Sequence, residues 1–173
     1  MDVNMNVVIT GSGQGLGFHL ADIFLSHGHS VAGLVYRENG NTKALQKKYG
    51  NSYVPFRVDL LSDGQIKRTA SRIARIFTAI DILVNNAGVH PEHHKPDIGD
   101  IDFSVYLPTY RINAAAPLFL VNELIPLIRA GDAKLIVNIS SEAGSTGAAM
   151  RKSEYSYCMS KAALNMATRL LHN

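Results

Sequence analysis

The sequence predicts an α/β fold, a doubly wound parallel sheet with helices on both of its faces. The first observation is that short apolar runs rich in β-branched residues alternate with helical patterns along all 173 residues. The second is a glycine-rich turn between the first apolar run and the first helical pattern. The third is that polar motifs stand where later apolar runs end. Strands that alternate with helices are joined by crossovers, and crossovers make the strands of a sheet parallel.

The first strand and the first helix are predicted from a change of hydrophobic period. Residues 3–10 form a strand, because the second half of this run is β-branched and almost unbroken, as in a sheet covered on both faces. After the glycines the apolar residues recur at helical spacing, and Gly28 ends the helix. The recurring residues are Leu16, Leu20, Ile23 and Phe24.

Strands and helices continue to alternate along the rest of the chain. Further strands are predicted over residues 30–36, 53–58, 80–84 and 133–139. Further helices are predicted over residues 43–49, after a cap at Ser62, over residues 104–129 with a bend near Pro117, and over residues 157–171. The helix capped by Ser62 places four apolar residues on one face, namely Ile66, Ala70, Ile73 and Phe77.

The composition fits one soluble globular domain over residues 1–173. Apolar residues make up 46% of the chain and the net charge is +3, without a block of Lys or Arg that would indicate nucleic-acid binding. The single cysteine, Cys158, excludes an internal disulfide and indicates a reducing compartment. The start, MDVNMN, does not resemble a signal peptide, and the apolar stretch 114–128 is too short and interrupted to span a bilayer. We therefore expect a cytoplasmic protein without membrane or nucleic-acid partners.

The glycine-rich turn reads VVITGSGQGLG over residues 7–17. Such a turn lets backbone N–H groups and the helix dipole face an anion, and the missing side chains let a pyrophosphate lie against the main chain. The pattern G-x-G-x-x-G is out of register, because its third glycine would fall on Leu16, and no Gly-Lys-Ser/Thr follows as in a phosphate loop. The pattern that fits is T-G-x-x-x-G-x-G, with Thr10, Gly11, Gly15 and Gly17.

Three further motifs lie at or beside the carboxyl ends of predicted strands, where parallel sheets bind ligands. They are NNAG at 85–88, NISS at 138–141 and YCMSK at 157–161. Together with the glycine turn, and in this order, they closely resemble the short-chain dehydrogenase/reductase family from Val7 to the last residue. The resemblance implies a Rossmann fold, here with strand order 3-2-1-4-5. It also implies an oxidoreductase that transfers hydride between a nicotinamide cofactor and a carbonyl or alcohol substrate.

Tyr157 and Lys161 are four residues apart and so share one face of the last predicted helix. A free tyrosine, with a pKa of about 10, is a poor acid–base group at neutral pH. An ammonium one turn away stabilises the phenolate and makes the tyrosine a usable proton donor. Tyr155 has Met159 at the same spacing and lacks a cationic partner there. The spacing therefore favours Tyr157 as the reactive tyrosine.

The resemblance gives catalytic roles to four residues. It implies that Tyr157 is the acid/base, that Lys161 also holds the nicotinamide ribose, and that Asn113 in YRINAAAP links the lysine to a water chain. It also implies that a serine after the fifth strand orients the substrate carbonyl; Ser140 and Ser141 compete for this role, and the family's usual choice is Ser141. Tyr157 follows Ser141 by sixteen positions, more than the family commonly shows. We expect the extra stretch, GSTGAAMRKSE, to place another polar group near the substrate.

The end of the second strand favours NADP as the cofactor, with NAD as the alternative. Dinucleotide folds that prefer NAD place an acid there, on the ribose 2′-OH. In LVYREN, Val35 or Tyr36 stands at that position and Arg37 follows, which suits a 2′-phosphate. Glu38 argues for NAD, but it comes one or two positions late.

The family resemblance also assigns Asp59 to the adenine. The implied cofactor residues are Thr10, Gly11, Gly15, Leu16, Gly17, Tyr36, Arg37, Asp59, Leu60, Asn86, Ala87, Gly88, Tyr157 and Lys161.

The loop HPEHHKPD invites a metal site that we do not expect. Its candidate ligands are His90, His93, His94 and Asp97. Neighbouring histidines in a proline-bearing loop rarely share a face, and neither H-E-x-x-H nor a cysteine pair supports them. We therefore predict no metal.

The chain stops one helix after Lys161, whereas the family's fold continues with a further strand and a substrate-covering loop. We therefore expect a domain truncated at its C-terminus relative to the family, and the substrate stays unnamed. A cofactor-binding sensor without catalytic activity is the alternative function, but a pure binder would not need all four catalytic residue types.

We also expect a homo-oligomer through the long helix and the last helix. The apolar stripe on the last helix is Ala163, Met166, Ala167 and Leu170. The missing C-terminal part is the alternative cover for this stripe.

Overall fold

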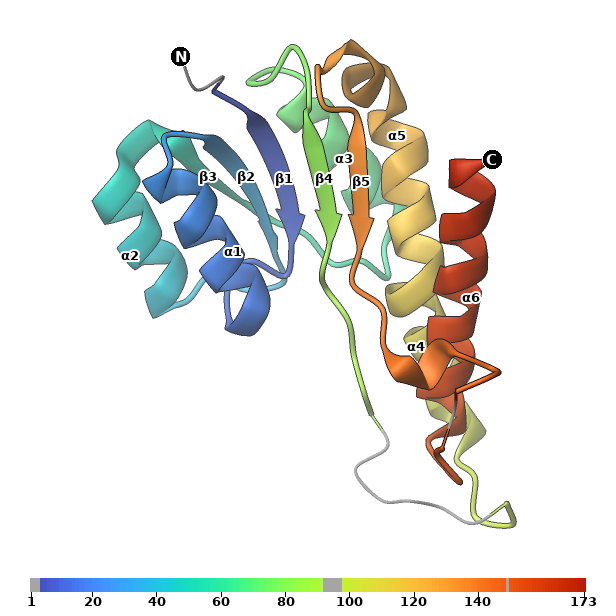
Figure 1. Ribbon diagram of the computed structural model, residues 1–173. Coiled ribbons are helices and arrows are strands. Elements are labelled where there is room, and N and C mark those ends of the chain that lie inside the picture. The colour runs from blue at the N-terminus through green and yellow to red at the C-terminus, as the bar shows by residue number, and fades with distance from the viewer. Residues whose placement is uncertain (1–3, 92–97, 149) are drawn as a thin grey trace.

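The computed structural model describes residues 4–91, 98–148 and 150–173, and its centre is one parallel sheet (Figure 1). The strands are β1 (Asn6–Thr10), β2 (Ser30–Val35), β3 (Tyr53–Arg57), β4 (Ile82–Asn85) and β5 (Leu135–Asn138). Their order in the sheet is β3-β2-β1-β4-β5, and every neighbouring pair is parallel. The predicted fold class and strand order are confirmed.

Helices cover both faces of this sheet, and each face has its own apolar cluster. One face packs against α1 (Gly15–Ser26) and α2 (Gly40–Tyr49), with Val7, Ile9 and Val31 at the centre of the cluster. The other face packs against α3 (Asp63–Ile73) and α5 (Ala116–Ala130), around Val8 and Leu83. Burial on both faces explains why the strands read as nearly continuous apolar runs.

The long helix between β4 and β5 is interrupted, as predicted. It consists of η2 (Phe103–Val105), α4 (Tyr106–Tyr110), the π-helical turn η3 (Arg111–Ala115) and α5. Pro117 has no N–H to donate to the carbonyl of Asn113, which accounts for a wider turn just before it. This turn brings the Asn113 side chain to the carboxyl edge of the sheet.

Among the described residues, one helical stretch, Phe103–Ala130, is long and apolar enough to cross a membrane, whereas the sequence indicated only the shorter apolar stretch 114–128. In its most apolar window, 44% of the residues are buried within the protein. Leu120, Leu124 and Ile128 pack in the cluster between the sheet and α3. The stretch is built as the core helix of a globular fold.

The helical periodicity of α1 was predicted correctly, but only two of the four apolar residues that indicated it, Leu20 and Phe24, pack against the core cluster. The buried residues of α1 are Gly17, Ala21 and Leu25, whereas Leu16 and Ile23 are 52% and 54% exposed. The reason is that Gly17 lies against the Gly11 carbonyl, where a Cβ would collide with the main chain. The small side of the helix therefore faces the sheet.

Most predicted boundaries differ from the observed ones by a few residues, for local reasons. Val3, the first residue of the first predicted strand, lies outside the described part of the chain. The helix α2 begins at Gly40 because Asn39 caps it, accepting hydrogen bonds from the backbone N–H groups of Asn41 and Thr42. The last helix, α6 (Tyr155–His172), begins after Glu154, whose backbone is left-handed.

Candidate active site

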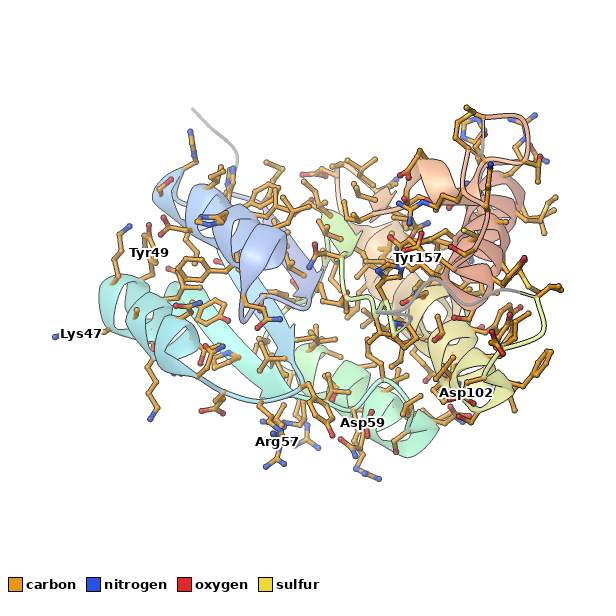
Figure 2. All side chains as sticks on the ribbon, turned by 90° about the horizontal axis from the view of Figure 1, so that it is seen from below. Lys47, Tyr49, Arg57, Asp59, Asp102 and Tyr157 are labelled. Carbon is orange, nitrogen blue, oxygen red and sulfur yellow. The ribbon has the colours of Figure 1, made fainter. Side chains whose placement is uncertain are left out.

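The predicted motifs gather at the carboxyl ends of the strands. Figure 2 shows this side of the sheet, with Asp59 and Tyr157 labelled on it. Asp59 follows β3, and Tyr157 lies in the first turn of α6. Ligands of open parallel sheets bind at this edge.

The glycine turn is held by the side chains of Thr10 and Asn86. The Thr10 hydroxyl accepts hydrogen bonds from the backbone N–H groups of Asn86 and Ala87, at 3.0 and 2.9 Å. The Asn86 side-chain amide donates to the Thr10 carbonyl at 2.9 Å. Gly11 and Gly15 have φ values of +70° and +52°, the left-handed region that favours glycine. The turn after β1 and the NNAG motif after β4 therefore form one locked unit.

A cavity of about 690 Å³ opens over this unit. Ten of the predicted cofactor residues line it: Thr10, Gly11, Gly15, Tyr36, Arg37, Asp59, Leu60, Asn86, Ala87 and Gly88. Leu16, Gly17, Tyr157 and Lys161 are not among its lining residues. Gly17 contributes to the turn by its lack of a side chain, because a Cβ would collide with the Gly11 carbonyl and the Asn86 amide.

Asn39 is a lining residue that the sequence did not single out. Its amide donates to the Gly13 carbonyl at 2.8 Å, and the Asn41 amide donates to the same oxygen at 3.1 Å. These bonds tie the N-terminus of α2 to the glycine turn. The available signal was an asparagine, a residue type that often caps helices, shortly before the predicted helix 43–49. Gly13, Val89 and Ile112 also line the cavity without having been predicted.

Asn113 is buried, and both ends of its amide are used. Its Oδ1 accepts from the backbone N–H of Val89 at 2.8 Å. Its Nδ2 donates to the Val89 carbonyl at 2.9 Å and to the Ser160 hydroxyl at 3.0 Å. Asn113 thus connects the segment after β4, at Val89, to Ser160 on α6, the residue before Lys161.

Lys161 is nearly completely buried beneath Tyr157. Its Nζ lies 5.8 Å from the centre of the Tyr157 ring and donates to the Ile139 carbonyl at 2.7 Å. Burial lowers the pKa of Lys161 below its ordinary value. Gly88 links this pair to the cavity, because a Cβ on Gly88 would lie 3.7 Å from the lysine nitrogen.

Both candidate serines after β5 donate hydrogen bonds to neighbouring side chains. Ser141 Oγ donates to Glu142 at 2.6 Å and accepts from the backbone N–H of Ala143 at 3.2 Å. Ser140 Oγ donates to Asn165 on α6 at 2.5 Å. The short helix η4 (Glu142–Gly144) packs directly on α6, where Gly144 leaves no room for a side chain. The choice between Ser140 and Ser141 stays a prediction.

His90 lies at the site, although the sequence considered it only as a metal ligand. Its ring centre is 4.3 Å from that of Tyr157, and its Nε2 is 3.0 Å from a Glu154 carboxylate oxygen. The other candidate ligands, His93, His94 and Asp97, lie outside the described residues. The described residues contain no group of three or more metal-ligating side chains.

The apolar stripe on α6 is partly open to solvent. Met166 and Leu170 are 61% and 67% exposed, and Ala163 and Ala167 line a hollow between α6 and the helices α4 and α5. The predicted pairing of these helices with a second copy stays a prediction.

Comparison with known proteins places this geometry in a family. A family model described as short chain dehydrogenase matches residues 5–173. An uncharacterized oxidoreductase of Thermotoga maritima is 34% identical over 169 residues, covering 95% of this chain and 63% of that protein. A short-chain dehydrogenase of Penicillium roqueforti is 31% identical over 175 residues, covering 92% and 68%. The matches cover between 53% and 63% of the length of three of the curated relatives.

Solved structures agree with this placement. A short-chain dehydrogenase/reductase structure from Burkholderia multivorans with bound NADP has a TM-score of 0.85 and 29% identity, covering 98% of this chain and 72% of that one. An NADPH-bound carbonyl reductase from chicken fatty liver has a TM-score of 0.84 and 26% identity, covering 96% and 72%. The chain belongs to the short-chain dehydrogenase family.

Proposed function

We propose that the protein is an NAD(P)-dependent oxidoreductase that interconverts a carbonyl and an alcohol. The observation that carries this proposal is the junction at Gly88. Gly88 lines the cavity of about 690 Å³, and a Cβ on it would lie 3.7 Å from Nζ of the buried Lys161, which is 5.8 Å from the centre of the Tyr157 ring. A binding site for a dinucleotide and a proton donor with a neighbouring cation are the two parts that such a reaction requires.

A bound nicotinamide cofactor would supply or accept the hydride. The glycine turn and Asn86 would hold its pyrophosphate, and Asp59 its adenine. Tyr157 would deliver a proton to the carbonyl oxygen, and the Lys161 ammonium would stabilise the resulting phenolate. Ser141 would orient the carbonyl, which requires its hydroxyl to turn from Glu142 toward the substrate. Asn113 would keep the segment at Val89 and the part of α6 that carries Lys161 in fixed relative positions, through its bonds to Val89 and Ser160.

The substrate class is tested by a panel of aldehydes and ketones with NADPH on the full-length protein. We expect loss of NADPH absorbance at 340 nm with at least one member of the panel and formation of the matching alcohol. Tight binding of NADPH without turnover of any panel member would instead favour a cofactor sensor, the alternative function.

We further propose that NADP is preferred over NAD. Arg37 and Tyr36 line the cavity, whereas Glu38, the residue that argued for NAD, does not. The N-terminus of α2 begins three residues after Arg37, and its backbone N–H groups favour a negative charge. The NADP bound by the Burkholderia multivorans protein and the NADPH bound by the chicken carbonyl reductase support this assignment.

Arg37→Ala should weaken NADPH binding by roughly tenfold or more and leave NADH binding nearly unchanged, because a guanidinium–phosphate hydrogen bond is charge-assisted. Fluorescence titration of each nucleotide measures both affinities. Arg57→Ala is the matched control, since Arg57 is exposed at the end of β3 and does not line the cavity. An equal loss of affinity for NADPH and NADH would show that Arg37 does not hold the 2′-phosphate.

A further inference from the structure

Four charged or titratable side chains form a continuous chain of contacts between Ser141 and Tyr157. Glu142 accepts from the Ser141 hydroxyl with Oε2 and from the Arg151 guanidinium with Oε1, at 2.6 to 2.9 Å. Arg151 also donates to Glu154 Oε2 at 2.6 Å. The other Glu154 oxygen contacts His90, whose ring lies against Tyr157. Arg151 is therefore the central member, because its guanidinium holds two carboxylates at once.

The extra stretch between Ser141 and Tyr157 supplies both Arg151 and Glu154. The sequence predicted a polar group near the substrate from the length of this stretch. The structure places the Arg151 guanidinium carbon 5.7 Å from the centre of the Tyr157 ring.

Glu154 has an unusual backbone for its residue type. Its φ and ψ are 66° and 41°, and its side chain is 13% exposed. Left-handed backbone is unfavourable for a residue with a Cβ, and glycine would adopt it freely. Glutamate at this position is explained by its carboxylate, which contacts both Arg151 and His90. Strained positions of this kind cluster at functional sites.

The two carboxylates that Arg151 contacts outweigh its positive charge. Glu142 and Glu154 carry two negative charges against the one positive charge of Arg151, so the three groups together present no net positive charge to the Tyr157 oxygen. The Ser141 hydroxyl and Arg151 also hold the pKa of Glu142 down to about 2, so this carboxylate stays ionised at neutral pH. A direct electrostatic role for Arg151 is therefore weak, whereas its bidentate geometry is well suited to fixing side chains.

We propose that Arg151 is a positioning residue, which fixes Ser141 through Glu142 and the Tyr157 ring through Glu154 and His90. This inference rests on the proposed function, because it assigns the two positioned groups to carbonyl reduction. In the bound complex the Ser141 hydroxyl must turn its hydrogen bond from Glu142 to the substrate carbonyl, and it keeps its proton throughout. Arg151 keeps Glu142 in place during that exchange, so the serine hydroxyl has two defined partners.

The test compares Arg151→Met, Arg151→Lys and Lys152→Met in the full-length protein. Arg151→Met should lower kcat by roughly tenfold to a hundredfold, the loss expected from a small misplacement of reacting groups, with the NADPH affinity unchanged. Arg151→Lys should restore only part of kcat, because an ammonium cannot hold both carboxylates in the same plane. Lys152→Met removes the same charge one residue away and should behave as wild type. Full activity of Arg151→Lys would show that charge, and not bidentate positioning, is what matters.

Two further measurements separate positioning from a general loss of structure. Millimolar guanidinium chloride should restore part of kcat to Arg151→Ala, while the same concentration of sodium chloride should not. Glu154→Gly removes the carboxylate and also relieves the left-handed backbone, so kcat should fall while the melting temperature does not. Unchanged kcat in Glu154→Gly would overturn the proposal.

The ring signals of Tyr157 provide a readout that does not need turnover. They can be assigned in ¹³C-tyrosine spectra by their loss in Tyr157→Phe. Arg151→Met should shift or broaden them, because the His90 ring is no longer fixed beside Tyr157, and Lys152→Met should leave them in place. If the wild type reduces no carbonyl, the proposed function fails, and the spectra alone still decide whether Arg151 positions Tyr157. Unmoved signals in Arg151→Met would overturn the positioning role whether or not the enzyme is active.

Discussion

Tyr157→Phe should lower kcat for carbonyl reduction by roughly 10²–10⁴-fold, the usual contribution of a positioned general acid. Phenylalanine keeps the ring that packs against His90 and lies over Lys161, and it removes the only proton that the side chain can transfer. Because the ring and its packing are kept, NADPH affinity should change little. Steady-state kinetics together with a fluorescence titration of NADPH measure both quantities.

Tyr155→Phe is the matched control for this variant. Tyr155 lies in the same first helical turn, but its hydroxyl donates to the Lys152 carbonyl at 3.4 Å, away from the Tyr157–Lys161 pair. Its loss should leave kcat near the wild-type value. A Tyr157→Phe enzyme with wild-type turnover would show that another group delivers the proton.

The strand order could be predicted because it follows from general rules for connecting parallel strands, and these rules need only the order of strands and helices along the chain. Alternating strands and helices require parallel crossovers, and the first glycine turn marks the strand at the centre of the sheet. The boundaries depend on individual side chains instead. The N-terminal end of β4 is an example: Asp81, just before it, bonds through its carboxylate to the backbone N–H groups of Asn6 and Asp132. Neither partner is close to Asp81 in the sequence.

The face of α1 shows a second limit. Periodicity located the helix through residues such as Leu16 and Ile23, but both are exposed. Hydrophobicity alone ranks leucine above glycine as a core residue. Here a main-chain contact between Gly17 and the Gly11 carbonyl decides the orientation, and such a contact is not visible in a hydrophobic pattern.

The candidate site divides in the same way. Residues within contiguous motifs, such as Asn86 and Lys161, were predicted and lie at the expected edge of the sheet. The groups that surround them were missed or given another role, because they come from separate loops. His90 was considered as a metal ligand, although its described contacts are with Glu154 and Tyr157. Only the length of the stretch before Tyr157 indicated that polar groups would be present there.

Lys161→Met should abolish most of the activity and weaken cofactor binding without destabilising the fold. The ammonium is proposed to serve both the Tyr157 phenolate and the nicotinamide ribose, so kcat should fall by roughly 10²–10⁴-fold and the Kd for NADPH should rise. Methionine has a similar length and needs no desolvation of a charge, so it should pack well in this buried position. Leu164→Met, at a buried position three residues further along α6, is a suitable comparison for changes in helix packing alone. If Lys161→Met kept its activity, the lysine would have no part in the proton transfer.

The pH dependence of stability gives an independent test of the buried ammonium. Burial lowers the pKa of Lys161 below its ordinary value of 10.5, so between these two pKa values the unfolded chain binds more protons at this group than the folded protein does. In that window the contribution of Lys161 to the free energy of unfolding rises with pH, and below the lowered pKa it is constant. Lys161→Met lacks this contribution, so the free energy of unfolding of the variant, relative to that of the wild type, should fall as the pH rises toward 10.5. Urea denaturation of both proteins at several pH values measures the difference, and a difference that does not change with pH would show that Lys161 is not desolvated in the folded protein.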